Sequence, residues 1–455
     1  MFNPCNSHRR TRLICAAIMS LGLLLPGCAS LSQPSPTGSS QSKVPAQQIR
    51  WWGDFEDPLL SQLIEQALQA NTNIRAAQAA LQQARALRDV KAASALPGVT
   101  LSGSAQRNQT ESADGSNSFR AGLDARWELD VFGAVRSGIH ASEADTLASQ
   151  ASLQDVQVSI AAEVALTYIQ LRGQQAQLAI ARSNLSSQSE TLQLTDWRAQ
   201  AGLVTSLEVE QAKAANAQTS AQIPALTASV GKTRHSLAVL TGQEPLALDP
   251  LLSPTQPVPQ ATDLSAKAIP ANALRQRGDV RAAEHRIQAA LSRVDAADAA
   301  RYPSFNLGGS LSLGALTLAG LTNGASLAGS VLGSLSVPLF DAGAGKSQVL
   351  AQRAALEQAR ATYQNTVLTA FKEVEDALAS LQADRQRLQF LQLAAAAAEN
   401  ADLLAQNRYS SGLIDFQTVL QTQRTLLGAQ DSVAGLQAEL SSDHVRLIKA
   451  MGGGW

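Results

Sequence analysis

Apolar and polar residues alternate strictly over residues 119–131. The apolar positions are Phe119, Ala121, Leu123, Ala125, Trp127, Leu129 and Val131, and between them lie Arg120, Gly122, Asp124, Arg126, Glu128 and Asp130. A period of two places every apolar side chain on one face of a β-strand and every charge on the other. A half-buried strand of a soluble protein has the same pattern, but this stretch is longer than most such strands. It suits an outer-membrane barrel strand, which presents apolar side chains to lipid and polar ones to a lumen.

The same alternation marks three further stretches. Their apolar-face positions are Val99, Leu101, Gly103 and Ala105, then Phe305, Leu307, Gly309, Leu311 and Leu313, then Val331, Gly333, Leu335, Val337 and Leu339. We predict two membrane β-hairpins, one within 97–131 with polar residues 108–117 as its turn, and one within 303–340. No charged residue lies between Tyr302 and Phe340, but the many Gly and Ser residues and Pro338 argue against a transmembrane helix there.

Two very long helices are predicted from about residue 137 to 201 and from about 346 to 409. The first stretch has no Pro and only two Gly, and the second has neither. At ~1.5 Å per residue, each helix would be about 90–100 Å long. Val367, Val374, Leu381 and Leu388 are spaced seven apart, which indicates coiled-coil packing. The helices alone would equally fit a plain antiparallel coiled-coil rod.

The chain is internally duplicated. Ile74-Arg75-Ala76-Ala77 recurs as Val280-Arg281-Ala282-Ala283 at an offset of 206, and Gly202-Leu203 recurs as Gly412-Leu413 at an offset of 210. This period is far longer than the roughly 20–50 residues of solenoid repeats. We predict two half-molecules, 51–245 and 271–455, joined by a linker at 246–270. Each has the order helix, two strands, very long helix, tight turn and helix, so the fold class is mainly α with membrane β.

A sheet of four strands has two open edges, and open edges are not tolerated in lipid. Two copies would give eight strands, barely enough to be filled by side chains, whereas three copies would give twelve strands around a lumen. The strand count therefore predicts a barrel formed between copies of the chain.

The N-terminus resembles an export signal. Residues 1–27 hold a basic segment and an uncharged stretch too short to span a bilayer. The segment that ends at Cys28 resembles a bacterial lipobox, although Pro26 is not a favoured residue there. We expect a covalent lipid on Cys28 and a flexible Ser/Pro/Gln-rich tether over 28–50. In the lipoprotein sorting systems that this signal resembles, Asp after the Cys retains a protein at the inner membrane, so Ala29 implies the outer membrane. The alternative is a free Cys after an ordinary signal peptide.

Composition excludes several classes of function. Loss of residues 1–27 removes three Arg and no acid, so the formal charge changes from −1 to −4, which argues against nucleic acid as a partner. Cys28 is the one cysteine left, so no internal disulfide is expected. The five histidines lack metal-ligand spacing, and Gly343-Ala-Gly-Lys-Ser347 lacks the first Gly of a phosphate-binding loop. We therefore predict no enzyme, and no cofactor besides the lipid on Cys28.

Five segments in order resemble the outer membrane factor family, the TolC-like channels. They are Trp51-Trp52 with Phe55 and Asp57-Pro58-Leu59, Trp127 to Gly133 with Arg136, Arg277 to Glu284, Ala370 to Leu378, and Arg408 to Gly412. The third segment has Gly278 where the family motif has Pro. The resemblance runs from about Trp51 to Met451. It is strongest to the nodulation-type efflux lipoproteins of resistance-nodulation-division systems.

The resemblance implies a homotrimer in the outer membrane of a Gram-negative bacterium. Twelve strands would form one barrel in outer-membrane lipid, and twelve helices would continue it as a cylinder through the periplasm. Short helices near 58–91 and 271–300 would complete the cylinder, with residues 246–270 and the C-terminal tail in a belt around it. The implied partners are a periplasmic adaptor (membrane fusion protein) and an inner-membrane efflux pump.

The two tight turns are the candidate functional site. They are Ala201-Gly202-Leu203 and Ser411-Gly412-Leu413, and a Gly after a helix commonly takes the left-handed conformation that ends it. The resemblance implies that these turns form a periplasmic tip that meets the adaptor. In several family members acidic rings lie six and nine residues after the second Gly, where this chain has Thr418 and Gln421. Candidate gate residues are these two with Glu208, Arg198 and Tyr409, and the alternative for each is a solvated helix face.

The leading functional hypothesis is a passive trimeric duct that exports drugs or other small toxic molecules delivered by a pump. The first alternative is the outer component of a type I protein-secretion system. The second is a non-conducting, lipid-anchored coiled-coil scaffold in the periplasm.

Overall fold

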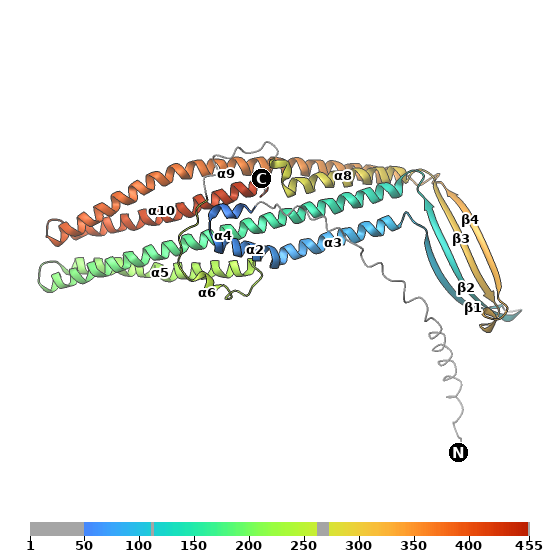
Figure 1. The fold of residues 1–455 in the computed structure, drawn as a ribbon, viewed down its shortest axis with the longest axis horizontal. Helices are drawn as coiled ribbons and strands as arrows, with labels where there is room; N and C mark the ends of the chain where they lie inside the picture. Colours follow the sequence, from blue (N-terminus) through green and yellow to red (C-terminus); the bar gives the residue numbers. More distant parts are fainter. Residues whose placement is uncertain (1–49, 111–112, 262–272, 454–455) are drawn as a thin grey trace, which may run out of the picture. The chain divides into compact units, whose positions relative to one another are not determined.

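A computed structural model describes residues 50–110, 113–261 and 273–453. The predicted signal peptide, Cys28 and nearly all of the tether lie outside the described residues. The chain from Trp51 onward forms one unit. In this unit the four-stranded sheet lies at the end of the long helices where α4 and α9 begin (Figure 1).

The duplication is visible in the lengths of the helices. Helices α4 (Ala134–Gln200) and α9 (Ala344–Ser410) each have 67 residues, and α5 (Ser206–Leu240) and α10 (Phe416–Ala450) each have 35. The first half also contains η1 (Trp51–Phe55), α2 (Pro58–Ala70) and α3 (Thr72–Ala93), and the second half contains α7 (Ala273–Gln276) and α8 (Gly278–Ala299). The linker between the halves contains the short helix α6 (Asp249–Leu252). Among the described residues, no helix has the length and hydropathy needed to cross a membrane.

The sheet consists of β1 (Gly98–Thr110), β2 (Ala113–Leu129), β3 (Ser304–Ala315) and β4 (Ser326–Ser336), in that order and all antiparallel. A short η3 turn (Ala319–Leu321) lies between β3 and β4. Leu123 pairs with Leu101 and Leu311, whereas its neighbour Asp124 pairs with Thr100 and Ser310. This register keeps one face apolar and the other polar across β1, β2 and β3, as the alternation predicts, while Leu332 of β4 lies on the polar face opposite Gly308.

The turn of the first hairpin is shorter than the predicted 108–117, so that prediction was wrong in its bounds. Pairing continues through Asn108 with Ser116 to Thr110 with Ala113, so the polar residues belong to the strands. A strand is held by backbone hydrogen bonds, which polar side chains do not interrupt. At the other hairpin, β4 ends at Ser336, short of the predicted Val337 and Leu339 and just before Pro338, which cannot donate to a ladder.

Side-chain caps fix where the short helices begin. Asp57 accepts hydrogen bonds from the amides of Leu59 and Leu60 at 2.9 and 3.0 Å and so begins α2. Asn71 interrupts the helix predicted near 58–91: its side chain accepts from the amide of Asn73 at 2.8 Å and begins α3. Its Nδ2 donates to the Leu240 carbonyl at 2.8 Å, which ties α3 to the end of α5.

The main core lies where α2 and η1 meet the middle of α4 and the ends of α5 and α10. Its buried members include Trp51, Trp52, Phe55, Leu60, Leu63, Ile64, Tyr168, Ile169, Leu171, Leu237 and Val445. Arg172 is fully buried beside it and donates to Gln175, the Pro254 carbonyl, Tyr168 and Gln256 at 2.7–3.1 Å. A buried guanidinium is tolerated only with such partners. Arg172 therefore anchors the Pro-rich segment after α6 to α4.

Two of the family-like segments contact each other. Arg277, 7% exposed, forms ion pairs with Asp279 and with Glu373 of α9, each at 2.8 Å. It also donates to the Ala450 carbonyl at 2.7 Å. The segment around Arg277 therefore joins the start of α8 to α9 and to the end of α10, which is a structural role.

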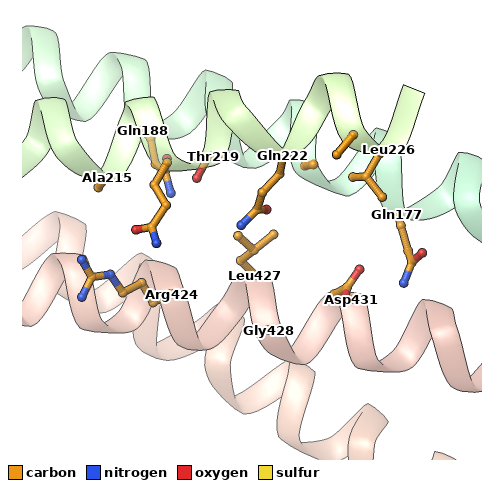
Figure 2. Close-up of a pocket in the computed structure, with 13 residues that line it drawn as sticks. Gln177, Gln188, Ala215, Thr219, Gln222, Leu226, Arg424, Leu427, Gly428 and Asp431 are labelled. Atoms are coloured by element: carbon orange, nitrogen blue, oxygen red, sulfur yellow. The ribbon is translucent and has the colours of Figure 1, made fainter. Parts of the chain in front are cut away.

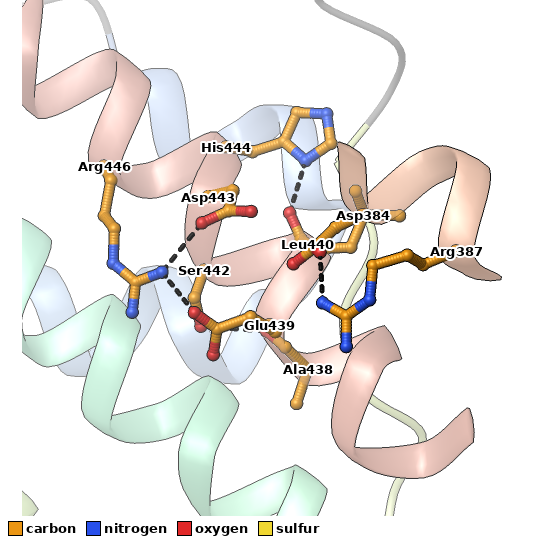
Figure 3. A network of polar contacts seen from close by, with 9 residues as sticks. All are labelled: Asp384, Arg387, Ala438, Glu439, Leu440, Ser442, Asp443, His444 and Arg446. Atoms are coloured by element: carbon orange, nitrogen blue, oxygen red, sulfur yellow. Dashed lines mark hydrogen bonds and ion pairs between the residues drawn. The ribbon is translucent and has the colours of Figure 1, made fainter. Parts of the chain in front are cut away.

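A second polar network lies on α9 and α10 (Figure 3). Arg446 contacts Glu439 at 2.6 Å and Asp443 at 2.7 Å, while Arg387 contacts Asp384 at 2.6 Å. Burial raises the pKa of Asp443, and Arg446 offsets part of this effect. Arg385 and His444 approach each other at 3.4 Å and link the two helices. The ion pairs therefore each lie within one helix, and of the contacts in this network the Arg385–His444 approach is the one that crosses between α9 and α10.

Gly278 stands at a close approach of α8 to α4. A Cβ added there would lie 2.7 Å from the Asp155 amide nitrogen and 2.8 Å from the Ala151 carbonyl oxygen. Both atoms are helix backbone and cannot rotate away. Gly278, which replaces the Pro of the family motif, therefore lies so close to α4 that a residue with a Cβ would not fit there.

We expect Gly278→Ala to force α8 away from α4 and to lower the free energy of unfolding by about 1–3 kcal/mol. The matched control is Gly231→Ala in α5, where an added Cβ meets nothing within 4 Å. That variant should be neutral or more stable by about 0.5–1 kcal/mol. Thermal unfolding of both variants checks this. Equal unfolding temperatures for the two would contradict the close α4–α8 contact.

Candidate functional site

The two helical turns have the same backbone geometry. Gly202 has φ +74° and Gly412 has φ +73°, so the predicted left-handed conformation is confirmed at both. The amide of Leu203 donates to the Arg198 carbonyl at 2.8 Å, and that of Leu413 donates to the Arg408 carbonyl at 2.9 Å. These bonds define the Schellman motif, which satisfies the last carbonyls of a helix. The sequence repeat Gly-Leu is therefore a repeated helix stop.

The leucines of these turns point into solvent. Leu203 is 71% exposed and Leu413 is 74% exposed. The flanking Ala201 and Ser411 are exposed as well. Each turn thus carries one uncovered leucine, and we call Leu203 and Leu413 together the tip surface.

Arg198 joins the two turns within one chain. Its Nη1 donates to the Tyr409 carbonyl at 2.9 Å and its Nη2 to the Ser410 carbonyl at 3.3 Å. Its guanidinium carbon also lies 4.7 Å from the centre of the Tyr409 ring. The structure thus brings together these two predicted gate residues. A cation at the C-terminus of α9 also interacts favourably with the helix dipole.

The Tyr409 side chain belongs to a small apolar cluster below the turns. Its ring lies 5.5 Å from that of Phe416, and both are almost fully buried. The other buried members are Ala212, Ala215, Ala405, Val419 and Leu420. The Tyr409 hydroxyl is buried and has no hydrogen-bond partner among the described residues. Such an orphaned group normally finds a partner in water or in another chain.

The other predicted gate residues differ in their surroundings. Thr418 is exposed, and its amide and hydroxyl both donate to Asp415, the N-cap of α10. These bonds lower the pKa of Asp415. Gln421 is exposed. Glu208 is half-buried in the first turn of α5, and its Oε2 has no partner among the described residues.

Sequence reasoning missed a second set of polar residues near the turns. Asp402 of α9, 6% exposed, accepts from Thr422 of α10 at 3.0 Å and from Gln406 at 2.7 Å. Burial raises the pKa of Asp402. Gln423 of α10 donates to Thr191 of α4 at 3.1 Å. The available signal was the i,i+4 spacing of Asp402 and Gln406 in an Ala-rich helix.

A groove of about 810 Å³ lies between α4, α5 and α10, next to the Gln423–Thr191 contact. Its walls carry Gln177, Gln188, Gln218, Thr219, Gln222, Leu226, Arg424, Leu427 and Asp431, and Figure 2 shows Gln222 and Leu427 facing each other across it. Four glutamines lie among small and apolar residues in this lining, together with the charged Arg424 and Asp431. Within the described ranges, no group of three or more His, Cys, Asp or Glu is arranged to hold a metal ion.

We expect Arg198→Ala to loosen the α9–α10 turn, because it removes two charge-assisted hydrogen bonds and a cation–π contact. A loss on the order of 1–2 kcal/mol would speed hydrogen exchange of the amides near 409–413 about tenfold. Tyr409→Phe is the matched control, since it keeps both the ring and the carbonyl that Arg198 contacts. Unchanged exchange in Arg198→Ala would show that Arg198 does not hold the turns together.

Comparison with known proteins places this geometry in a family. A sequence model described as "Outer membrane efflux protein" matches residues 63–243 and 269–453, one stretch in each half. The pyoverdine export outer membrane protein OpmQ of Pseudomonas putida is 33% identical, over 98% of each chain. The solvent efflux pump outer membrane protein SrpC of Pseudomonas putida is 32% identical, over 88% of this chain and 86% of its own.

A solved structure agrees. The outer-membrane channel OprN superposes with a TM-score of 0.83 at 38% identity, covering 89% of this chain and 92% of its own. The predicted fold class is confirmed, and trimeric barrels are the known assembly of this fold. The chain belongs to the outer membrane efflux protein family.

Proposed function

We propose that three copies of this chain form a passive duct through which small molecules leave the cell. The observation that carries this proposal is the four-stranded sheet with an apolar face, a polar face and two edges that no described strand covers. Closure of those edges in lipid requires further copies, and twelve strands leave a lumen. The charged groups Arg120, Asp124, Arg126 and Glu128, on the polar face of the part of β2 that pairs with β3, would then line water.

The proposed duct works as the outer part of a tripartite system. An inner-membrane pump would supply the energy, and a periplasmic adaptor would connect the pump to the tip surface. The relatives support this arrangement, because SrpC is named as the outer membrane protein of an efflux pump. Their names differ in cargo, pyoverdine in one case and solvents in the other. We therefore propose small molecules as the class of cargo and protein secretion as the less supported alternative.

The proposed gate lies at the turns. Tyr409 and Glu208 carry buried oxygen atoms without a described partner, and a neighbouring copy could supply one. The proposed aperture is neutral at Thr418 and Gln421, so it would select weakly between cations and anions. The lipid on Cys28 completes the proposal by holding the tether at the outer membrane.

The test is single-channel conductance of the purified protein in planar bilayers, with its mass measured in detergent. We expect the mass of three acylated subunits and a small conductance that is similar for cations and anions. A large steady conductance from trimers would contradict the proposal that the gate is closed at rest. Monomers without conductance would overturn the duct and favour a lipid-anchored scaffold.

Adaptor docking is tested by making the tip surface polar. We expect Leu203→Gln with Leu413→Gln to abolish cross-linking to the adaptor and efflux of a fluorescent dye in cells. Trimers should persist, because both side chains are exposed. The matched control is Leu246→Gln, which is 66% exposed and lies beyond the far end of α5. Full efflux by the double variant would rule out docking at these leucines.

A further inference from the structure

The two β-hairpins end at different levels. Pairing of β3 with β4 stops at Gly314 with Ser326, and Gly314 lies opposite Arg120 of β2. Pairing of β1 with β2 continues past Arg120 as far as Ala113. At ~3.3 Å per residue, strand pairing in the first hairpin continues about 20 Å farther than strand pairing in the second, which ends in the connection 316–325. Both ends point away from the helices (Figure 1).

The level at which the second hairpin stops is the upper limit of the apolar band. The last apolar row of the sheet is Ala105, Phe119 and Ala315. Beyond it, the first hairpin carries Arg107, Asn108 and Asn117, which are side chains suited to water. The end of the second hairpin therefore lies at the boundary where hydrocarbon gives way to head groups.

The connection between β3 and β4 runs over 316–325, and its first part is rich in leucine, whereas its end is Asn323-Gly324-Ala325. Residues 316–322, here called the β3–β4 loop, are Leu316, Thr317, Leu318, Ala319, Gly320, Leu321 and Thr322. Leu316 is 73% exposed and Leu318 is 66% exposed. No charged residue occurs anywhere between Tyr302 and Phe340. A loop that ended in water would gain nothing from two exposed leucines.

The β3–β4 loop folds toward the apolar face of the sheet. A Cβ added at Gly320 would lie 3.0 Å from the Cβ of Ala315, which has the same facing as Leu311 and Leu313. The η3 turn in this loop contacts both β2 and β3. Phe119, opposite Ala315, is half-buried, whereas Leu101 and Val331 on the same face are 79% and 83% exposed. The loop thus continues the apolar band outward and does not cover the polar face.

We propose that the β3–β4 loop is a lipid-contacting element that inserts Leu316 and Leu318 among the acyl chains of the outer leaflet. The occupant is lipid because the loop is continuous with the apolar face that the barrel presents to the membrane. The inference rests on the proposed function, since it takes that face to contact lipid. Each trimer would carry three such elements, placed between projecting polar hairpins.

The test uses single cysteines labelled with an environment-sensitive NBD fluorophore at Leu318→Cys, Val331→Cys and Asn117→Cys. The full-length protein is reconstituted into phosphatidylcholine vesicles with or without brominated acyl chains. Bromine in both leaflets makes the readout independent of orientation. The mature chain has one native cysteine, Cys28, so unsubstituted protein gives the labelling background.

We expect the label at position 318 to be blue-shifted, quenched by brominated lipid as strongly as the label at 331, and protected from aqueous iodide. The label at 117 should show the reverse behaviour. If 331 is quenched by lipid while 318 is quenched by iodide, the inference is overturned and the duct stands. Protection of 318 from both quenchers also overturns it, since the loop would then pack on protein. Absence of lipid quenching at 331 and 318 alike would overturn the membrane assignment of the sheet itself.

Discussion

Backbone groups at a sheet edge cannot remain unpaired in hydrocarbon, and this constraint governs the rest of the molecule. The strands follow chain order, so β1 and β4 are the two edges of each copy. In a closed barrel, β1 of one copy meets β4 of the next. Every copy then has the same orientation, and all the long helices leave the sheet in the same direction. A cylinder of helices beyond the membrane is the geometric consequence.

The helices can form such a wall because their contacts are close and repeated. Each of α4 and α9 begins after a left-handed glycine, Gly133 or Gly343, and ends at a Schellman motif. Between these points the buried residues are mostly small or polar, and large side chains gather near Trp51. Close approach then depends on residues such as Gly278, where one added carbon would meet helix backbone.

Stability is consequently uneven along the unit. The Trp51 region combines a large apolar core with the buried Arg172 network, whereas the turns rest on a small cluster and on Arg198. Regions with few buried apolar contacts open at lower free-energy cost. The polar atoms of Tyr409 and Glu208 that lack a described partner lie in this weaker region. A gate placed there would move without disturbing the core.

The sequence by itself determined the duplication, the two hairpins, the long helices and the Gly-Leu turns, because periodicity and helix-ending glycines are local signals. It did not determine where β1 and β2 turn, since polar side chains leave the backbone ladder intact. Nor did it reveal that Arg198 contacts Tyr409, or that Asp402 of α9 accepts a hydrogen bond from Thr422 of α10. Those partners are far apart in the chain or on different helices, so only tertiary packing decides which of them meet.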